Sequence, residues 1–161
     1  MKMILIRGPL GVGKTTISKK LTKIIDGRYY SIDKILEDND LDHLDEKEGF
    51  IPLKNFNKIN KIILNDITSN KLESYIIDGC FYYIDQINQL KKLFGSKLII
   101  FSLKASLKSC ILRDKNRKNS LGTKATKEVY NKVNEVDIGI PIHTENKKEE
   151  DIIREIINKI N

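Results

Sequence analysis

A lysine and a hydroxyl-bearing residue follow closely spaced glycines near the start of the 161-residue chain. The segment Gly8–Thr15 reads GPLGVGKT and matches the pattern GxxxxGK[ST]. A loop that curls its backbone amides around a polyphosphate needs such glycines, because glycine tolerates positive φ angles and lets the backbone approach an anion closely. A helix that starts at the end of the loop adds unpaired amides and the positive end of its dipole. The segment therefore predicts a phosphate-binding loop.

Each part of this loop can be matched to a part of a bound nucleotide. We expect Lys14 to reach the β and γ phosphates, Thr15 to hold Mg²⁺ and Thr16 to reach the α phosphate. The backbone around the phosphates is expected to come from Gly8, Gly11, Val12 and Gly13. The alternative is a glycine-rich turn without chemistry. The apolar run at residues 3–6 before the loop and the helix-like stretch after it argue against that alternative.

Two aspartates follow apolar runs that are typical of short strands. Asp78 ends the run at residues 75–77, where a carboxylate beside the phosphate loop would bind Mg²⁺, usually through water. Asp33 ends the run at residues 29–32, where it could orient an acceptor hydroxyl and receive its proton. Simpler interpretations stay open. Asp78 and Gly79 could form an ordinary turn, and Asp33 could cap a following helix.

Two arginines supply the last candidate group. Arg113 and Arg117 stand four residues apart, so on a helix they would share one face. Converging guanidinium groups would neutralise the charge that spreads over a phosphoryl group during transfer. The alternative is a solvated basic helix. Because a polar loop follows at residues 120–123, we predict a mobile lid over about residues 113–130 that carries both arginines.

Short apolar runs alternate with longer amphipathic stretches along the whole chain. Strands are predicted at residues 2–7, 28–32, 74–78, 97–102 and 139–143. Helices are predicted at residues 14–25, 54–69, 84–94, 106–117, 126–135 and 148–160. This alternation predicts βαβ units and an α/β fold with a parallel sheet covered on both faces. Ligands then bind beyond the carboxyl ends of the strands.

The length favours one domain over residues 1–161, with residues 38–53 as a long loop or arm on the acceptor side. No apolar run approaches the length of a membrane span, so we expect a cytoplasmic protein with no membrane partner. Cys80 and Cys110 have neither metal nor redox spacing and are interpreted as reduced thiols.

The net charge of +7 is unevenly distributed. Residues 37–48 contain seven acids and one base, whereas residues 104–132 contain nine bases and two acids. Each segment could simply be a solvated face. If the acidic arm contacts substrate, however, it would disfavour a polyanionic one.

Four sequence motifs, in this order, resemble the compact P-loop kinases: GPLGVGKTT, SID, YIIDG and the Arg113-x-x-x-Arg117 pair. The chain is most similar to the kinase domain of polynucleotide kinases and to the small AAA-type predicted kinases. Gluconate, shikimate and adenylate kinases and chloramphenicol phosphotransferase are more remote. The resemblance implies a three-layer α/β/α fold with a five-stranded parallel sheet, ATP with Mg²⁺, and an arginine-bearing lid.

Position by position, the resemblance assigns phosphate and metal binding to Lys14 and Thr15, the catalytic base to Asp33, metal support to Asp78, and phosphate clamping to Arg113 and Arg117. The acidic arm departs from a kinase of polyanionic acceptors, so a nucleic-acid 5′ end is possible but not favoured.

Three functions remain open at this point. The leading hypothesis is an ATP-dependent kinase that phosphorylates a hydroxyl of a small molecule, a nucleoside or a nucleic-acid 5′ end. The alternatives are a nucleotide-dependent switch or binding module, and a basic nucleic-acid-binding protein that keeps the loop for stability. The acceptor, the preference for ATP or GTP, and the oligomeric state are left open.

Overall fold

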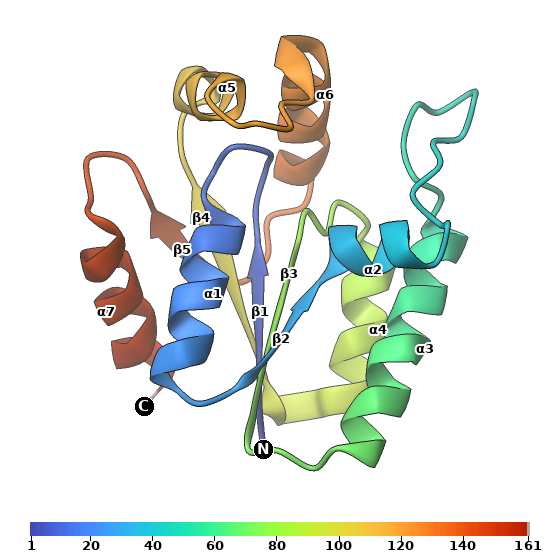
Figure 1. The fold of residues 1–161 in the computed structure, drawn as a ribbon, viewed down its shortest axis with the longest axis vertical. Helices are drawn as coiled ribbons and strands as arrows, with labels where there is room; N and C mark the ends of the chain where they lie inside the picture. The colour runs from blue at the N-terminus through green and yellow to red at the C-terminus, as the bar shows by residue number, and fades with distance from the viewer. Residues whose placement is uncertain (161) are drawn as a thin grey trace.

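A parallel sheet forms the centre of the molecule in the computed structural model, which describes residues 1–160 (Figure 1). The strands are β1 (Lys2–Arg7), β2 (Arg28–Ser31), β3 (Ser74–Gly79), β4 (Leu98–Lys104) and β5 (Ile140–His143). They lie in the order β2-β3-β1-β4-β5, and all neighbouring pairs are parallel. The predicted α/β fold with a five-stranded parallel sheet is therefore confirmed.

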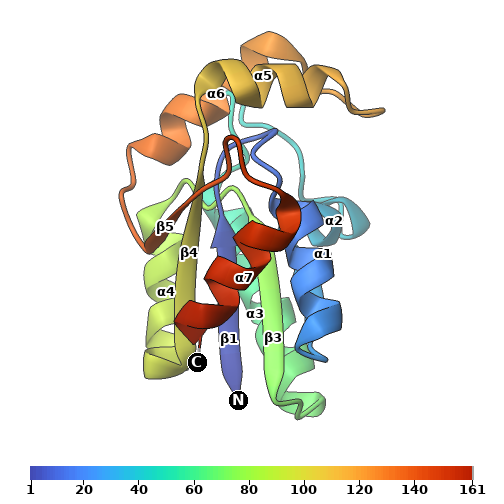
Figure 2. The ribbon, with the colours of Figure 1, turned by 90° about the vertical axis from the view of Figure 1, so that its left-hand side faces the viewer.

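Helices cover both faces of the sheet. The helices are α1 (Lys14–Ile24), α2 (Ile32–Asp38), α3 (Leu53–Ser69), α4 (Ile84–Phe94), α5 (Leu107–Lys115), α6 (Gly122–Asn134) and α7 (Glu149–Ile160), with a 3₁₀ turn at Gly95–Lys97. Helices α1 and α7 lie on one face, and α3 and α4 lie on the other (Figures 1 and 2). Helices α5 and α6 sit beyond the carboxyl ends of the strands (Figure 1). None of the helices within residues 1–160 is both long and apolar enough to cross a membrane.

The central strand β1 shows why the sheet needs helices on both sides. Met3 and Leu5 pack in the cluster formed with α3 and α4, whereas Ile4 and Ile6 pack in the cluster formed with α1 and α7. All four side chains are fully buried. A strand buried on both faces is apolar without alternation, which explains the continuous run before the phosphate-binding loop.

A short helix, α2, is not among the predicted helices, although the alternative interpretation of Asp33 places a helix directly after that residue. It begins directly after β2, and the Ser31 side chain caps it by accepting a hydrogen bond from the Lys34 amide at 3.4 Å. Asp33 therefore lies in the first turn of α2 and is not the cap. Its carboxylate is exposed and is not committed to the helix end.

The two helices of the predicted lid also differ from the sequence-based boundaries. Helix α5 ends at Lys115, two residues earlier than expected, and α6 begins at Gly122, four residues earlier. The buried Asp114 explains both differences. Its carboxylate accepts hydrogen bonds from the Ser120 hydroxyl at 2.7 Å and the Gly122 amide at 3.2 Å, which turns the chain back after α5.

Strand order brings the predicted functional segments together. The phosphate-binding loop follows β1, Asp78 lies next to the end of β3, and Asp33 follows β2. The register places Asp78 beside Ile6 of β1 on one side and Ser31 of β2 on the other. The arm, residues 39–52 in the structure, projects beside this end of the sheet (Figure 1).

Candidate active site

The phosphate-binding loop has the backbone shape that its glycines predict. Gly11 and Gly13 have positive φ angles of 72° and 103°, and α1 begins directly after Gly13. Gly11 has a second constraint. A Cβ atom there would lie 2.1 Å from the backbone carbonyl oxygen of Cys110 on α5. Gly11 therefore shapes the loop and also lets it pack against α5.

The Lys14 side chain folds back over this loop. It is 7% exposed, and its Nζ atom donates a hydrogen bond to the Pro9 carbonyl oxygen at 2.9 Å. Pro9 has no amide hydrogen to offer an anion, so its carbonyl is the group it contributes. The ammonium is thereby held against the loop, and Lys14 lines the cleft described below.

Thr15 and Asp78 form a hydroxyl–carboxylate pair beside the loop. The Asp78 carboxylate is 2% exposed and accepts a hydrogen bond from the Tyr29 hydroxyl at 2.9 Å, and Thr15 lies close to it. Burial raises the pKa of Asp78, while the positive charge of Lys14, the hydrogen bond from Tyr29 and the neighbouring Thr15 hydroxyl act in the opposite direction. Hard oxygen donors of this kind suit Mg²⁺, so the residues present fit that ion.

A cleft of about 570 Å³ joins most of the predicted site residues. Its lining includes Gly11, Val12, Gly13, Lys14, Thr15, Thr16, Asp33, Arg113 and Arg117. Gly8 and Asp78 do not line it. Gly8 packs against β4, where an added Cβ would lie 2.9 Å from the Leu103 carbonyl oxygen, and Asp78 is buried next to Thr15.

The two arginines reach the cleft in different ways. Arg113 on α5 donates to the Thr144 hydroxyl at 3.0 Å, to the Thr144 carbonyl at 3.2 Å and to the Val12 carbonyl at 3.4 Å. Arg117 lies beyond the end of α5, with a side chain that is 52% exposed and 3.7 Å from Asp114. The expectation that one helical face carries both arginines is therefore wrong, because the chain turns at Asp114.

Sequence reasoning missed the part of the cleft that follows β5. Thr144, Lys147, Glu149 and Ile152 line the cleft together with the phosphate-binding loop. Thr144 is held there because its amide donates to the Lys104 carbonyl of β4 at 2.9 Å. These residues match no motif. Their position directly after the last predicted strand could have indicated that they lie at the site, since the carboxyl ends of parallel strands share one edge of the sheet.

A second region, which we call the acceptor side, is aromatic and lies outside the lining of this cleft. Phe50 of the arm, Phe56 of α3, and Tyr82 and Tyr83 after β3 form a cluster with ring centroids 4.8–5.9 Å apart. Burial raises the pKa of the Tyr82 hydroxyl, and the nearby negative charge of Asp33 contributes in the same direction. None of the four rings lines the cleft, but the Asp33 carboxylate, which does, is near enough for its charge to act on Tyr82.

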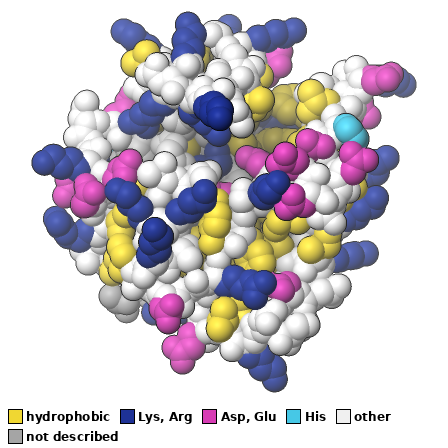
Figure 3. All heavy atoms as spheres, in the orientation of Figure 1, with side chains coloured by type: hydrophobic (Ala, Val, Ile, Leu, Met, Phe, Trp, Pro, Cys, Tyr) yellow, Lys and Arg dark blue, Asp and Glu magenta, His cyan; other side chains and the backbone are white. Residues whose placement is uncertain are grey.

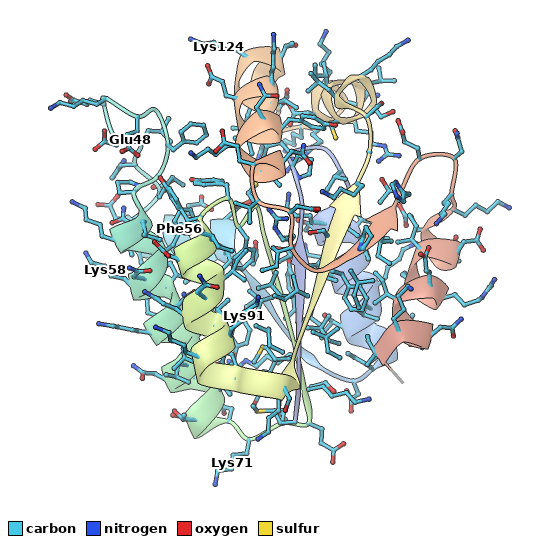
Figure 4. All side chains as sticks on the ribbon, turned by 180° about the vertical axis from the view of Figure 1, so that it is seen from behind. Glu48, Phe56, Lys58, Lys71, Lys91 and Lys124 are labelled. Atoms are coloured by element: carbon cyan, nitrogen blue, oxygen red, sulfur yellow. The ribbon has the colours of Figure 1, made fainter. Side chains whose placement is uncertain are left out.

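Acidic side chains surround this aromatic cluster. Figure 3 shows a hollow with hydrophobic side chains between the lid helices and the arm, and acidic side chains gather at its rim. Seen from behind, Glu48 lies on the arm and Phe56 lies on the helix below it (Figure 4). The charges of Glu48 and Asp45 reach Tyr83, where they add to the effect of burial in raising its pKa. The acceptor side thus combines aromatic surface with negative charge.

A family model described as an AAA domain matches residues 4–152. A stretch of 49 residues is 39% identical to a shikimate kinase from Marinomonas sp. (strain MWYL1). That match covers 29% of this chain and 27% of the kinase, so the chain spans only about a quarter of the length of this curated relative.

Three solved structures share the fold over nearly the whole chain. A gluconokinase from Sinorhizobium meliloti 1021 has a TM-score of 0.72 at 10% identity, covering 99% of this chain and 91% of that one. A sugar kinase from Janibacter sp. HTCC2649 has a TM-score of 0.74 at 12% identity, covering 98% and 93%. A shikimate kinase from Acinetobacter baumannii in complex with shikimate has a TM-score of 0.65 at 21% identity, covering 99% and 93%. The chain therefore belongs to the AAA-domain family and has the fold of the small P-loop kinases.

Proposed function

We propose that this protein is an ATP- and Mg²⁺-dependent kinase that transfers the γ-phosphoryl group to a hydroxyl of a small molecule. One observation carries the proposal. A single cleft contains the phosphate-binding loop, the exposed carboxylate of Asp33, and the guanidinium groups of Arg113 and Arg117. Phosphoryl transfer needs positioning and charge neutralisation more than covalent chemistry, and these groups supply both. The kinases found by similarity support this class of reaction.

The nucleotide is assigned to the loop and the first turn of α1. Backbone amides around Gly11 and Gly13 surround the β and γ phosphates, Lys14 pairs with them, and Thr16 reaches the α phosphate. Thr15 and Asp78 would hold Mg²⁺. That ion, when bound, neutralises charge on the β and γ phosphates. The part of the cleft beyond Thr144 then receives the remainder of the nucleotide.

Asp33 is assigned as the catalytic base. The acceptor hydroxyl oxygen attacks the γ phosphorus, its proton passes to the Asp33 carboxylate, and the bond between the γ phosphorus and the bridging oxygen breaks. ADP leaves with the electron pair of that bond. Asp33 suits this role because it is exposed in the cleft and does not cap its helix.

The lid, over about residues 113–130, brings positive charge to the transferring group. Arg113 is held by Thr144 and Val12, so it is positioned before any lid movement. Arg117 is half-exposed and forms an ion pair with Asp114 at 3.7 Å, so it can swing toward the γ phosphate when the lid closes.

The acceptor is assigned to a neutral or cationic class, such as a nucleoside, a polyol or an amino alcohol. Two observations support this choice. The acceptor side carries aromatic rings on which an apolar group can pack, and the end of α2 together with the arm contains seven acids and one base over residues 37–48. A polyanionic nucleic-acid end would be repelled there.

The test is a transfer screen with γ-labelled ATP and Mg²⁺ against nucleosides, polyols, amino alcohols and 5′-hydroxyl oligonucleotides. We expect one small-molecule class to be labelled, and Lys14→Ala to lower that labelling by about 100-fold or more. Asp33→Asn should keep ATP affinity and lower transfer by roughly 10²–10⁴-fold.

Asp85→Asn is the matched control, because Asp85 occupies the same position in the first turn of α4 and lies outside the cleft. It should leave transfer within about twofold of the wild type. Normal transfer by Asp33→Asn would remove the proposed base. ATP hydrolysis that needs a protein partner, without any labelled acceptor, would favour the nucleotide-dependent switch.

A further inference from the structure

Arg7 is a fully buried cation at the junction between β1 and the phosphate-binding loop. Its guanidinium donates to the Val136 and Val133 carbonyls, both at 2.8 Å, to the Ser102 hydroxyl at 3.0 Å and to the Phe81 carbonyl at 3.3 Å. All four acceptors are uncharged oxygens. No motif of the sequence and no role in the proposed chemistry accounts for this residue.

The first pair of contacts fixes the end of the second lid helix. Val133 lies in the last turn of α6, and Val136 follows two residues after the helix ends. Carbonyls at the end of a helix lack intrahelical partners and carry the negative end of the dipole, so a cation is stabilised there. Arg7 thus caps α6 from inside the protein.

The other contacts reach the sheet and the acceptor side. Ser102 of β4 accepts from Arg7 and donates its own hydroxyl to the Ile138 carbonyl at 2.6 Å, which ties the segment after α6 to the sheet. Phe81 lies in the loop after β3 with a positive φ of 49°, an uncommon conformation for a residue with a side chain. Arg7 therefore holds a strained loop that leads from Asp78 to the aromatic cluster.

The energetics make these contacts interdependent. A buried charge is strongly destabilising unless its donors are satisfied, and here the acceptors that satisfy Arg7 come from three separate segments. The Nε atom already lacks a partner. Moving the end of α6 away would remove both 2.8 Å hydrogen bonds at once. The hydrogen bonds of Arg7 therefore hold the end of α6 in place relative to β1.

We propose that Arg7 is a positioning residue that fixes the end of α6 and the loop after β3 to the base of the phosphate-binding loop. The lid then pivots at a point before Val133, and the acceptor side keeps a constant distance from the phosphates. The kinetic part of this inference rests on the proposed kinase function, whereas the positional part does not.

Amide hydrogen exchange of the nucleotide-free protein tests the positional part. Arg7→Met should speed exchange in residues 79–84 and 131–138 by about tenfold or more beyond any change in the rest of the chain, since hydrogen bonds to a charged donor are lost there. Arg7→Lys keeps the charge and should restore part of the protection near Val133. If Arg7→Met does not fold, the comparison of Arg7→Lys with the wild type carries the same test, with a smaller increase in the same two segments.

Ile156→Ala is the control for a general loss of stability, because Ile156 is fully buried in the cluster between the sheet and α7, on the other face. If an Arg7 variant and this control, compared at equal melting temperature, show the same exchange pattern, Arg7 only adds stability and the proposal fails.

Steady-state kinetics separate the two proposals. We expect Arg7→Lys to keep ATP affinity within about threefold and to lower kcat by about tenfold, because misplacement by an ångström is costly for transfer. An unchanged kcat would overturn the kinetic role. If the wild type proves to have no kinase activity at all, the exchange result still stands, because it needs no substrate.

Discussion

The phosphate-binding loop and the acceptor side are built in different ways. The loop is one continuous segment whose glycines set its φ angles, and its Lys14 is buried within it. The acceptor side joins Asp33, the arm and the aromatic cluster from segments far apart in the sequence, and most of the arm is exposed. For the proposed kinase, nucleotide binding therefore depends on local backbone geometry, whereas acceptor choice depends on how distant segments meet.

One glycine from each region allows a direct comparison. Gly11 in the loop and Gly49 in the arm have similar φ angles, 72° and 68°. A Cβ on Gly11 would lie 2.1 Å from the Cys110 carbonyl oxygen, whereas a Cβ on Gly49 would meet nothing within 4 Å. Substituting each by alanine separates the cost of the φ angle from the cost of the contact.

We expect the largest effect from this pair. Gly11→Ala should lower the free energy of unfolding by about 3–5 kcal/mol, because overpacking against backbone adds to φ strain, and it should abolish measurable ATP binding. Gly49→Ala should cost only about 1 kcal/mol and leave ATP affinity unchanged. Denaturant melts and calorimetric titration measure both. Equal losses from the two substitutions would show that the contact between the loop and α5 is unimportant.

Substitution of Arg113 or Arg117 should have effects smaller than that of Gly11→Ala, and the two variants should differ in which property they change. Arg113→Lys loses the fork that joins Thr144 to Val12, so we expect about 1–2 kcal/mol less stability and weaker ATP binding. Arg117→Lys should change stability by less than about 0.5 kcal/mol, because the side chain is half-exposed, yet lower kcat by roughly tenfold. Thermal melts with single-turnover kinetics distinguish them. If Arg117→Lys loses as much stability as Arg113→Lys, Arg117 is held by fixed contacts, as Arg113 is, and is not free to move.

The smallest effect concerns Asp78, which lies between the two regions. Burial raises its folded-state pKa above the unfolded value, so the wild type becomes less stable as the pH rises through that folded pKa. Asp78→Asn removes the charge and should make the substrate-free protein about 1 kcal/mol more stable at neutral pH, with the difference vanishing below pH of about 4.

Thermal melts between pH 4 and 8 measure this difference. The same variant should lose the increase in melting temperature that Mg²⁺ with ATP gives the wild type, whereas Asp85→Asn should keep it. A variant that is less stable than the wild type at neutral pH would show that the Asp78 charge is compensated in the folded protein.

Most of the strands and helices were predictable because their signals are local. The strand at Lys2–Arg7 and the helix at Ile84–Phe94 were placed at the observed residues. The error at α5 has a tertiary cause, since the Asp114 carboxylate turns the chain through contacts with Ser120 and Gly122. Helix α2 was missed because it has only seven residues, too few for a clear period.

Local patterns were enough to predict the phosphate-binding loop and the parallel sheet, because glycine φ angles and the period of apolar residues act between near neighbours. The surroundings of that loop depend instead on contacts between segments that are distant in the sequence. Arg113 meets the Val12 carbonyl across 101 residues of sequence, and Arg7 meets the Val136 carbonyl across 129. Such contacts join a side chain to a backbone carbonyl, which every residue type provides, so the sequence carries no local signal of which distant segment will supply it.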